Sequence, residues 1–162
     1  MENLVESLIN LFNGLGKEVV VFIISMLPLL ELRGGLLAAS LLKLDFLPGY
    51  IISIIGNTLP IPIVLLFLEK VLNWLKKFKS TTKFVNKIEN KILSKKDQIE
   101  KYGYIGLMLF VGIPLPGTGA WTGAGLAVLL NKKKKKSFLY IMLGVILASI
   151  IMSIISYGIL GN

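Results

Sequence analysis

The chain has 162 residues, 54% of them hydrophobic, and its 18 Lys and Arg outnumber its 9 Asp and Glu. A soluble domain of this size could not bury so much apolar surface, so the composition predicts a single integral membrane domain over residues 1–162. The absence of cysteine and histidine excludes thiol catalysis, Ser-His-Asp chemistry and the usual zinc or haem sites, and we expect no enzyme activity, metal or cofactor.

The first sixteen residues predict a short amphipathic helix on the membrane surface. Apolar residues recur there at helical spacing, with Glu2 and Glu6 between them. The alternative, that they form the first turn of the next helix, fits the pattern equally well. Residues 1–16 contain no basic start and no small-residue cleavage site, so we expect no cleavable signal.

Four long apolar runs follow, and each reaches the roughly 20 residues that a helix needs to cross a bilayer. They are 19–42, 46–68, 102–130 and 137–162. The third run has no charge, yet its stretch "IPLPGTGAWTGAG" (113–125) contains prolines and glycines that a continuous helix does not favour.

The distribution of charge predicts which runs cross fully. Ten of the 18 basic residues lie between Lys70 and Lys101, and five form the run Lys132–Lys136. Basic loops face the cytoplasm, but four full crossings would place these two blocks on opposite sides. We therefore predict that 102–130 is a re-entrant hairpin that returns to the side from which it entered, and we interpret 18–43 in the same way.

The predicted fold is an all-α membrane protein with an inverted-topology repeat. Each half would contain a re-entrant helical hairpin followed by a transmembrane helix, at 46–68 and at 137–160, with a cytoplasmic amphipathic linker at 69–101 between the halves. This order predicts a multi-pass protein of the prokaryotic plasma (inner) membrane, with the linker and the Lys132–Lys136 loop in the cytoplasm. A chain this small has little protein with which to surround the non-helical backbone of two hairpin tips, which favours a homodimer.

The linker carries a lysine every fourth residue, at Lys83, Lys87, Lys91 and Lys95. We interpret it as a helix that rests on anionic headgroups of the membrane lipids. No nucleic-acid recognition motif accompanies the basic residues, so we expect no nucleic-acid partner.

Glu31 and Arg33 lie in "PLLELRGG" (28–35), in the middle of an apolar run. Ionisable groups at that depth are expensive and mark a function by default. The structural alternative is a mutual ion pair, or a pair with the backbone, that holds the hairpin tip. Gly34, directly after Arg33, allows close approach or unusual dihedral angles.

The second tip has no charge and offers backbone groups instead. Pro114 and Pro116 would end the incoming half-helix, and Gly117, Thr118 and Gly119 would leave free N–H groups at the start of the outgoing one, where an anion binds favourably. Trp121 would stack on a ligand or fill a dimer seam, and the pattern does not decide between the two. Asn57, on the first crossing helix, is a polar candidate for the same cavity.

Three motifs resemble the small multi-drug export protein family: "PLLELRGG" (28–35), "GNTLPIP" (56–62) and "PLPGTGAWTGA" (114–124). That family in turn resembles the DedA/VTT membrane proteins. The resemblance implies two re-entrant hairpins with charged residues needed for transport, and recycling of polyprenyl phosphates or scrambling of lipids. Those relatives often place an acidic residue after Pro-Gly, where this chain has Gly117-Thr118.

Four functions are compatible with these features, of which one is a membrane scaffold without transport activity and the other three are forms of transport. The leading hypothesis is a transporter of an anionic amphiphile, such as the lipid phosphate undecaprenyl phosphate, coupled to protons or sodium ions through Glu31. The second is a proton-coupled exporter of cationic drugs that bind to Glu31. The third is a passive channel or lipid scramblase.

Overall fold

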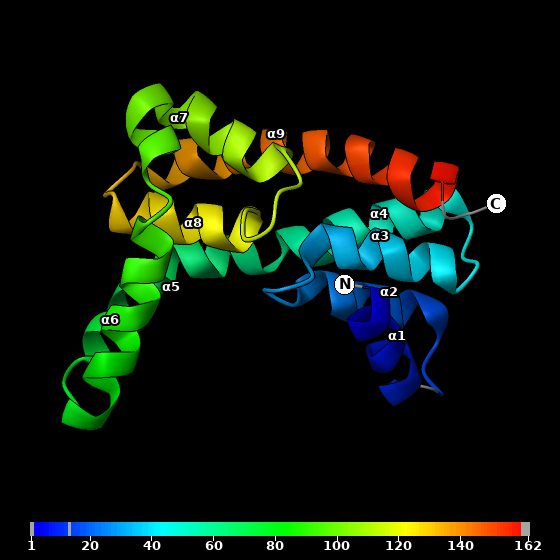
Figure 1. Ribbon diagram of the computed structural model, residues 1–162, viewed down its shortest axis with the longest axis horizontal. Coiled ribbons are helices and arrows are strands. Elements are labelled where there is room, and N and C mark those ends of the chain that lie inside the picture. The colour runs from blue at the N-terminus through cyan, green and yellow to red at the C-terminus, as the bar shows by residue number, and fades with distance from the viewer. Residues whose placement is uncertain (1, 13, 160–162) are drawn as a thin grey trace.

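The computed structural model describes residues 2–12 and 14–159, and within them every regular element is a helix (Figure 1). The prediction of an all-α protein is confirmed for these residues. Met1, Asn13 and Leu160, which the predicted segments include, lie outside them. The elements in chain order are α1 (Glu2–Leu11), α2 (Lys17–Met26), α3 (Glu31–Leu41), α4 (Phe46–Thr58), α5 (Pro60–Leu75), α6 (Lys79–Leu93), α7 (Asp97–Gly112), α8 (Ala120–Leu129), α9 (Lys134–Ser153) and the π-helical segment η1 (Ile154–Ile159).

Among the residues that the structure describes, two helical stretches are long and apolar enough to cross a membrane. They are Phe46–Leu75, formed by α4 and α5, with 30 residues, and Lys134–Gly158, formed by α9 and part of η1, with 25 residues. Their outward faces carry rows of exposed aliphatic side chains, which suit lipid rather than water. These rows are Leu47, Ile51, Ile55, Leu59 and Ile63 on the first stretch, and Leu139, Leu143, Ile146, Ile150 and Ile154 on the second.

The bounds of these stretches differ from the predicted ones. The first continues to Leu75 rather than ending at 68, because Glu69 and Lys70 are compatible with a helix. The second already begins at Lys134. The junction between α4 and α5 lies at Leu59, where Pro60 and Pro62 lack the N–H groups that a continuous helix needs.

Each long stretch follows a pair of short antiparallel helices. The pair α2–α3 packs on α4, and the pair α7–α8 packs on α9. Figure 1 shows that the turn between α2 and α3 and the loop between α7 and α8 both lie near the middle of the long axis, while the open ends of the two pairs lie at opposite ends of the molecule. We call these pairs the first and second hairpin.

Each long stretch contains one glycine that packs closely against the first helix of its hairpin. A Cβ added at Gly56 would lie 2.7 Å from the carbonyl oxygen of Phe22 on α2, and one at Gly144 would lie 2.6 Å from that of Met108 on α7. Each long helix therefore touches the backbone of the first half-helix of its own hairpin. This similarity supports the inverted repeat, which stays a prediction, as does its orientation in the bilayer.

Candidate functional site

Glu31 is the first residue of α3, and its carboxylate is bound by the second hairpin. Oε2 accepts a hydrogen bond from the backbone N–H of Ala120 at 2.9 Å, and Oε1 accepts one from Trp121 at 3.1 Å. These N–H groups belong to the first turn of α8, where a helix has unsatisfied donors and the positive end of its dipole. Glu31 is only 6% exposed, so it caps α8 from inside the protein.

The backbone on both sides of this contact is unusual. Glu31 has a positive φ of 52°, a conformation that non-glycine residues seldom adopt. Gly119, just before α8, has a φ of 142°, and a Cβ there would collide with the Glu31 carboxylate. Strained positions of this kind persist where the surrounding structure enforces them, and they cluster at functional sites.

Arg33 binds the loop that precedes α8. Its Nη1 donates to the carbonyl oxygen of Leu115 at 2.7 Å, and its Nη2 donates to Thr118 Oγ1 at 2.9 Å. The carbonyl oxygen of Ile113 lies 3.4 Å from Nη2. The prolines end α7 at Gly112 and leave these carbonyl groups outside a helix. They accept hydrogen bonds from within the loop, from the N–H groups of Leu115 and Thr118, and the planar guanidinium adds a second set of donors.

Glu31 and Arg33 do not form an ion pair with each other. In the part of the chain that the structure describes, the ion pairs are Lys76–Glu89 and Lys96–Glu100. Both charges bind the second hairpin instead. Free N–H groups were predicted at Gly117, Thr118 and Gly119, and of these the N–H of Thr118 donates to the carbonyl oxygen of Leu115 at 3.2 Å. The next two N–H groups along the chain, of Ala120 and Trp121, are the ones that Glu31 occupies.

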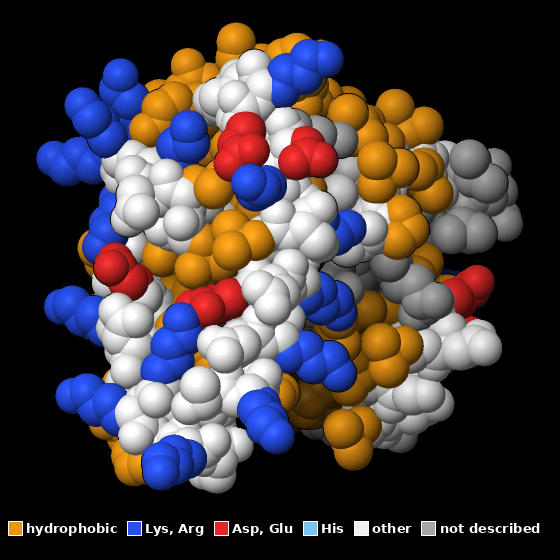
Figure 2. All heavy atoms as spheres, turned by 60° about the vertical axis from the view of Figure 1, so that its left-hand side comes forward, with side chains coloured by type: hydrophobic (Ala, Val, Ile, Leu, Met, Phe, Trp, Pro, Cys, Tyr) orange, Lys and Arg blue, Asp and Glu red, His pale blue; other side chains and the backbone are white. Residues whose placement is uncertain are grey.

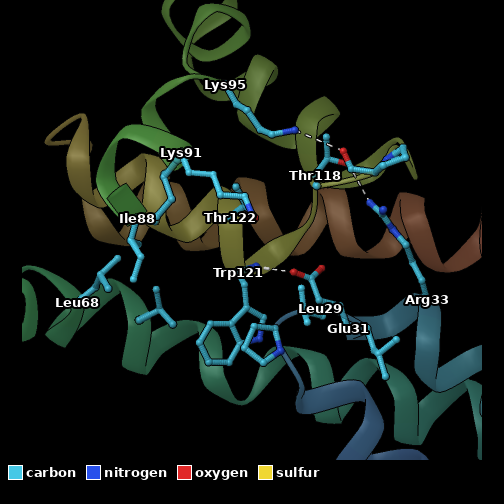
Figure 3. Close-up of a pocket in the computed structure, with 17 residues that line it drawn as sticks. Leu29, Glu31, Arg33, Leu68, Ile88, Lys91, Lys95, Thr118, Trp121 and Thr122 are labelled. Atoms are coloured by element: carbon cyan, nitrogen blue, oxygen red, sulfur yellow. Dashed lines mark hydrogen bonds between the residues drawn. The ribbon is translucent and has the colours of Figure 1, made fainter. Parts of the chain in front are cut away.

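A cavity of about 530 Å³ lies beside the two tips (Figure 3). Its volume is in the range of small-molecule sites. Four segments contribute to its wall: the first tip, the second tip with the start of α8, the α5 face with Val64 and Leu68, and the end of α6. Most of the lining is aliphatic or aromatic, and its charged members are Glu31, Arg33, Lys91 and Lys95.

The structure brings together most of the residues proposed from the sequence. Those that line the cavity are Glu31, Arg33, Pro116, Gly117, Thr118 and Trp121. Gly34, Asn57, Pro114 and Gly119 are not part of its lining, although Gly119 touches Glu31. Asn57 is 1% exposed, and its Oδ1 has no hydrogen-bond partner within the described residues.

Sequence reasoning missed the contribution of α6 to the cavity. Ile88, Lys91, Ile92 and Lys95 all line it. Their pattern of isoleucines beside a lysine stripe was visible, but it fits a lipid surface as well as a protein cavity. In residues 2–12 and 14–159, no group of three or more Asp and Glu lies close enough to hold a metal ion.

A family model described as "Putative small multi-drug export protein" matches residues 31–151. The chain belongs to this family. The match begins at Glu31 and includes Arg33, the second tip and α6, so the whole charged lining of the cavity lies within the small multi-drug export region. No curated protein and no solved structure matches the chain.

The family description names an exporter, which indicates a transporter rather than an enzyme. Together with the two long apolar helical stretches, it indicates a membrane location. The recognition of this family from the three sequence motifs is confirmed.

Proposed function

We propose that this protein is a membrane transporter that moves an anionic amphiphile, a lipid phosphate such as undecaprenyl phosphate, across the bilayer. The observation that carries the proposal is the composition of the cavity beside the hairpin tips. Leu29, Leu68 and Trp121 give it apolar walls, and three cationic side chains against one carboxylate give it an excess of positive charge. Apolar walls suit a lipid chain, and the excess cations suit an anionic head.

Glu31 provides the coupling to an ion gradient. Its carboxylate holds the first turn of α8 through Ala120 and Trp121. A protonated Glu31 is a weaker acceptor and releases these donors, which an anionic headgroup then binds. Proton binding and substrate binding thus favour the same state, in which the two tips separate. A sodium ion that neutralises Glu31 would act in the same way.

The proposed orientation follows the basic residues. Lysines gather on the end of the molecule that carries α6, the start of α7 and the start of α9, as Figure 2 shows. We place this end in the cytoplasm of a prokaryotic cell. The second hairpin then enters from the cytoplasm, and the first enters from outside. We further propose that two copies of the chain form a homodimer.

Purified protein reconstituted in liposomes tests the function. We expect it to move a fluorescent prenyl phosphate across the bilayer faster when a pH gradient is applied. Glu31→Gln should remove the response to the gradient, and Arg33→Gln should lower flux at least tenfold. A wild-type protein that neither binds nor moves phosphate lipids would contradict the proposal.

Export of cationic drugs is the second candidate, and the family description favours it. In that case Glu31 would be the binding carboxylate. Glu31→Gln would abolish efflux of a lipophilic cation, and Arg33→Ala would be tolerated. In the anionic-substrate proposal Arg33 is essential, so the two variants separate the candidates. A passive channel or scramblase would show flux that ignores the pH gradient.

A further inference from the structure

We propose that Lys91 and Lys95 bind the headgroup in this cavity and select a phosphate monoester over a diester. The inference rests on the proposed function and identifies the substrate class more narrowly. It assigns a binding role to α6, which the sequence alone predicts to lie on lipid headgroups.

The apolar face of α6 packs on protein. Val85 is fully buried, and Ile88 and Ile92 line the cavity. A Cβ at Gly125 of α8 would lie 3.2 Å from Ile92 Cδ1, so the two helices are in close contact there. This docking places Lys91, in the last turn of α6, and Lys95, just after its end, over the hairpin tips.

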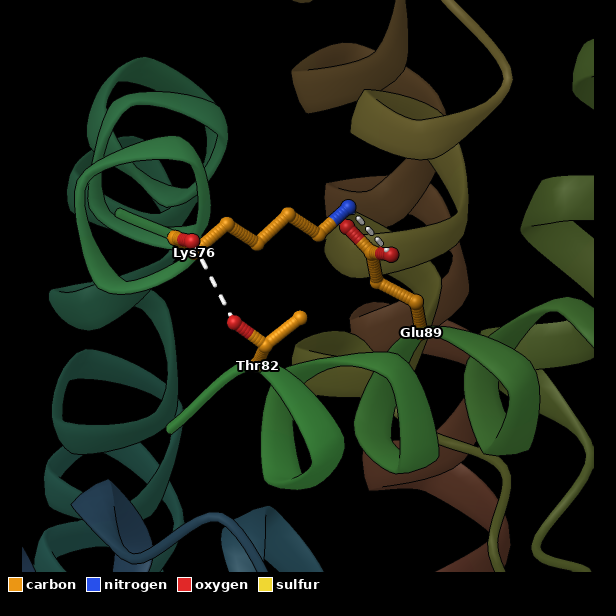
Figure 4. A network of polar contacts seen from close by, with 3 residues as sticks. All are labelled: Lys76, Thr82 and Glu89. Atoms are coloured by element: carbon orange, nitrogen blue, oxygen red, sulfur yellow. Dashed lines mark hydrogen bonds and ion pairs between the residues drawn. The ribbon is translucent and has the colours of Figure 1, made fainter. Parts of the chain in front are cut away.

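Polar contacts hold α6 to the end of α5. Lys76 Nζ lies 2.7 Å from Glu89 Oε2, and Thr82 Oγ1 donates to the carbonyl oxygen of Lys76 at 3.2 Å (Figure 4). These contacts join residues on both sides of the turn between the helices. They fix the direction of α6, and hence the position of the lysines that follow Glu89.

Lys95 reaches the second tip. Its Nζ donates to the carbonyl oxygen of Pro116 at 3.4 Å, a long and weak contact. Figure 3 shows Lys95 extended toward Thr118, and Lys91 directed toward Thr122 at the cavity wall. Among the described residues no carboxylate lies within 4.0 Å of either ammonium group. Both charges are therefore available to a ligand.

The charges that line the cavity favour a dianion. Arg33, Lys91 and Lys95 are positive, and Glu31 is negative when ionised and neutral in the protonated state that binds substrate. The excess is therefore at least two positive charges. A phosphate monoester carries about −1.5 to −2 at pH 7 and has three terminal oxygens. A diester carries about −1, so it leaves at least one of the cations uncompensated. The charge balance thus selects the monoester.

The lysine stripe supplies a matched control. Lys83 and Lys87 lie on α6, as Lys91 does, and are exposed, but they do not line the cavity. A general attraction of α6 to anionic lipid would depend on all four lysines alike. A headgroup site depends on Lys91 and Lys95 only.

The experiment measures the affinity of the purified protein in neutral detergent for a prenyl phosphate and for its methyl diester. We expect the wild type to bind the monoester about tenfold more tightly, which corresponds to about 1.4 kcal/mol. Lys91→Gln with Lys95→Gln should remove this preference, and Lys91→Arg with Lys95→Arg should retain it. Lys83→Gln with Lys87→Gln should change neither affinity more than twofold. Each variant is first checked for a wild-type far-UV circular dichroism spectrum and elution volume.

Two results would overturn the inference alone. The first is an equal loss of affinity in the variant of Lys83 and Lys87 and in the variant of Lys91 and Lys95. The second is a wild-type protein that binds both lipids, with affinities that do not change when Lys91 and Lys95 are replaced by glutamine. A wild type that binds neither lipid would overturn the proposed function as well. The outcomes of the two proposals are therefore distinguishable.

Discussion

The tip of the first hairpin carries two charged side chains, Glu31 and Arg33, whereas residues 113–119 of the second tip carry none. The second tip offers backbone groups instead: N–H groups at the start of α8 and carbonyl groups in the loop before it. The carboxylate binds the N–H groups, and the guanidinium binds the carbonyl groups. The two tips are thus complementary rather than equivalent.

This difference explains the broken stretch "IPLPGTGAWTGAG" in an apolar run. Prolines and glycines there free backbone donors and acceptors that a continuous helix would use internally. Such groups are costly within a membrane unless protein or water satisfies them. The charges of the first tip do so, and each charge is in turn compensated by backbone dipoles. The second hairpin therefore needs no charge of its own at this contact.

The largest effect is expected from Gly119→Ala. The new Cβ would strain a backbone with a φ of 142° and displace the Glu31 carboxylate from α8. Together these should cost about 4 kcal/mol of stability and reduce transport below a tenth of the wild-type rate. Thermal unfolding in detergent and liposome flux measure the two effects. Gly16→Ala is the control, because Gly16 has a φ of −59° and a Cβ there would make only an ordinary contact, 3.5 Å from Glu18 Oε2. Wild-type stability and transport of Gly119→Ala would refute the contact between Glu31 and α8.

Arg33→Gln should have the next largest effect. It removes the donor to the carbonyl oxygen of Leu115 and one partner of Thr118, with an expected loss of about 2 to 3 kcal/mol. Arg33→Lys keeps the charge but not the forked geometry of the guanidinium. Its stability should therefore lie between those of the wild type and Arg33→Gln. If Arg33→Gln unfolds at the wild-type temperature, the guanidinium does not hold the second tip.

Gly56→Ala and Gly144→Ala test whether the halves are alike away from the tips. Each adds a Cβ against a backbone carbonyl, of Phe22 or of Met108, and overpacking of this kind costs about 1 to 3 kcal/mol. We expect the two variants to lose similar amounts in the same thermal unfolding assay. A loss in only one of them would argue against equivalent packing of the hairpins.

Thr118→Val should have the smallest effect, about 1 kcal/mol. Its Oγ1 accepts a hydrogen bond from Arg33 and lies 2.8 Å from the carbonyl oxygen of Leu115, to which it donates. Arg33 retains its bond to Leu115 without it. The measurement is thermal unfolding of Thr118→Val, of Arg33→Gln and of the double variant that combines them. Strictly additive losses would mean that the two side chains do not act together.

The sequence predicted part of this arrangement. Apolar run lengths identified the helices, and the two lysine blocks indicated that 102–130 turns back. The charges at Glu31 and Arg33 stood out because they interrupt an apolar run. A pair with the backbone was one alternative for them, but the particular N–H and carbonyl groups could not be predicted, because backbone groups leave no distinctive residue in a sequence.

The position of α6 was not predictable either. Its isoleucines and lysines would be equally favourable against lipid headgroups or against the cavity. Only the docking of Val85 and Ile92 on the rest of the protein distinguishes the two. The bounds of α5 also differed, because the charged pair Glu69-Lys70 ends an apolar run without ending a helix.

The most direct test of two hairpins that enter from opposite sides is labelling of single cysteines. The native chain has none, and positions 17, 43, 101 and 131, at the open ends of the hairpins, are all exposed. A membrane-impermeant thiol reagent should label Lys101→Cys and Asn131→Cys from the cytoplasmic side, and Lys17→Cys and Lys43→Cys from the other. Labelling of positions 101 and 131 from opposite sides would contradict a second hairpin that returns to the cytoplasmic side.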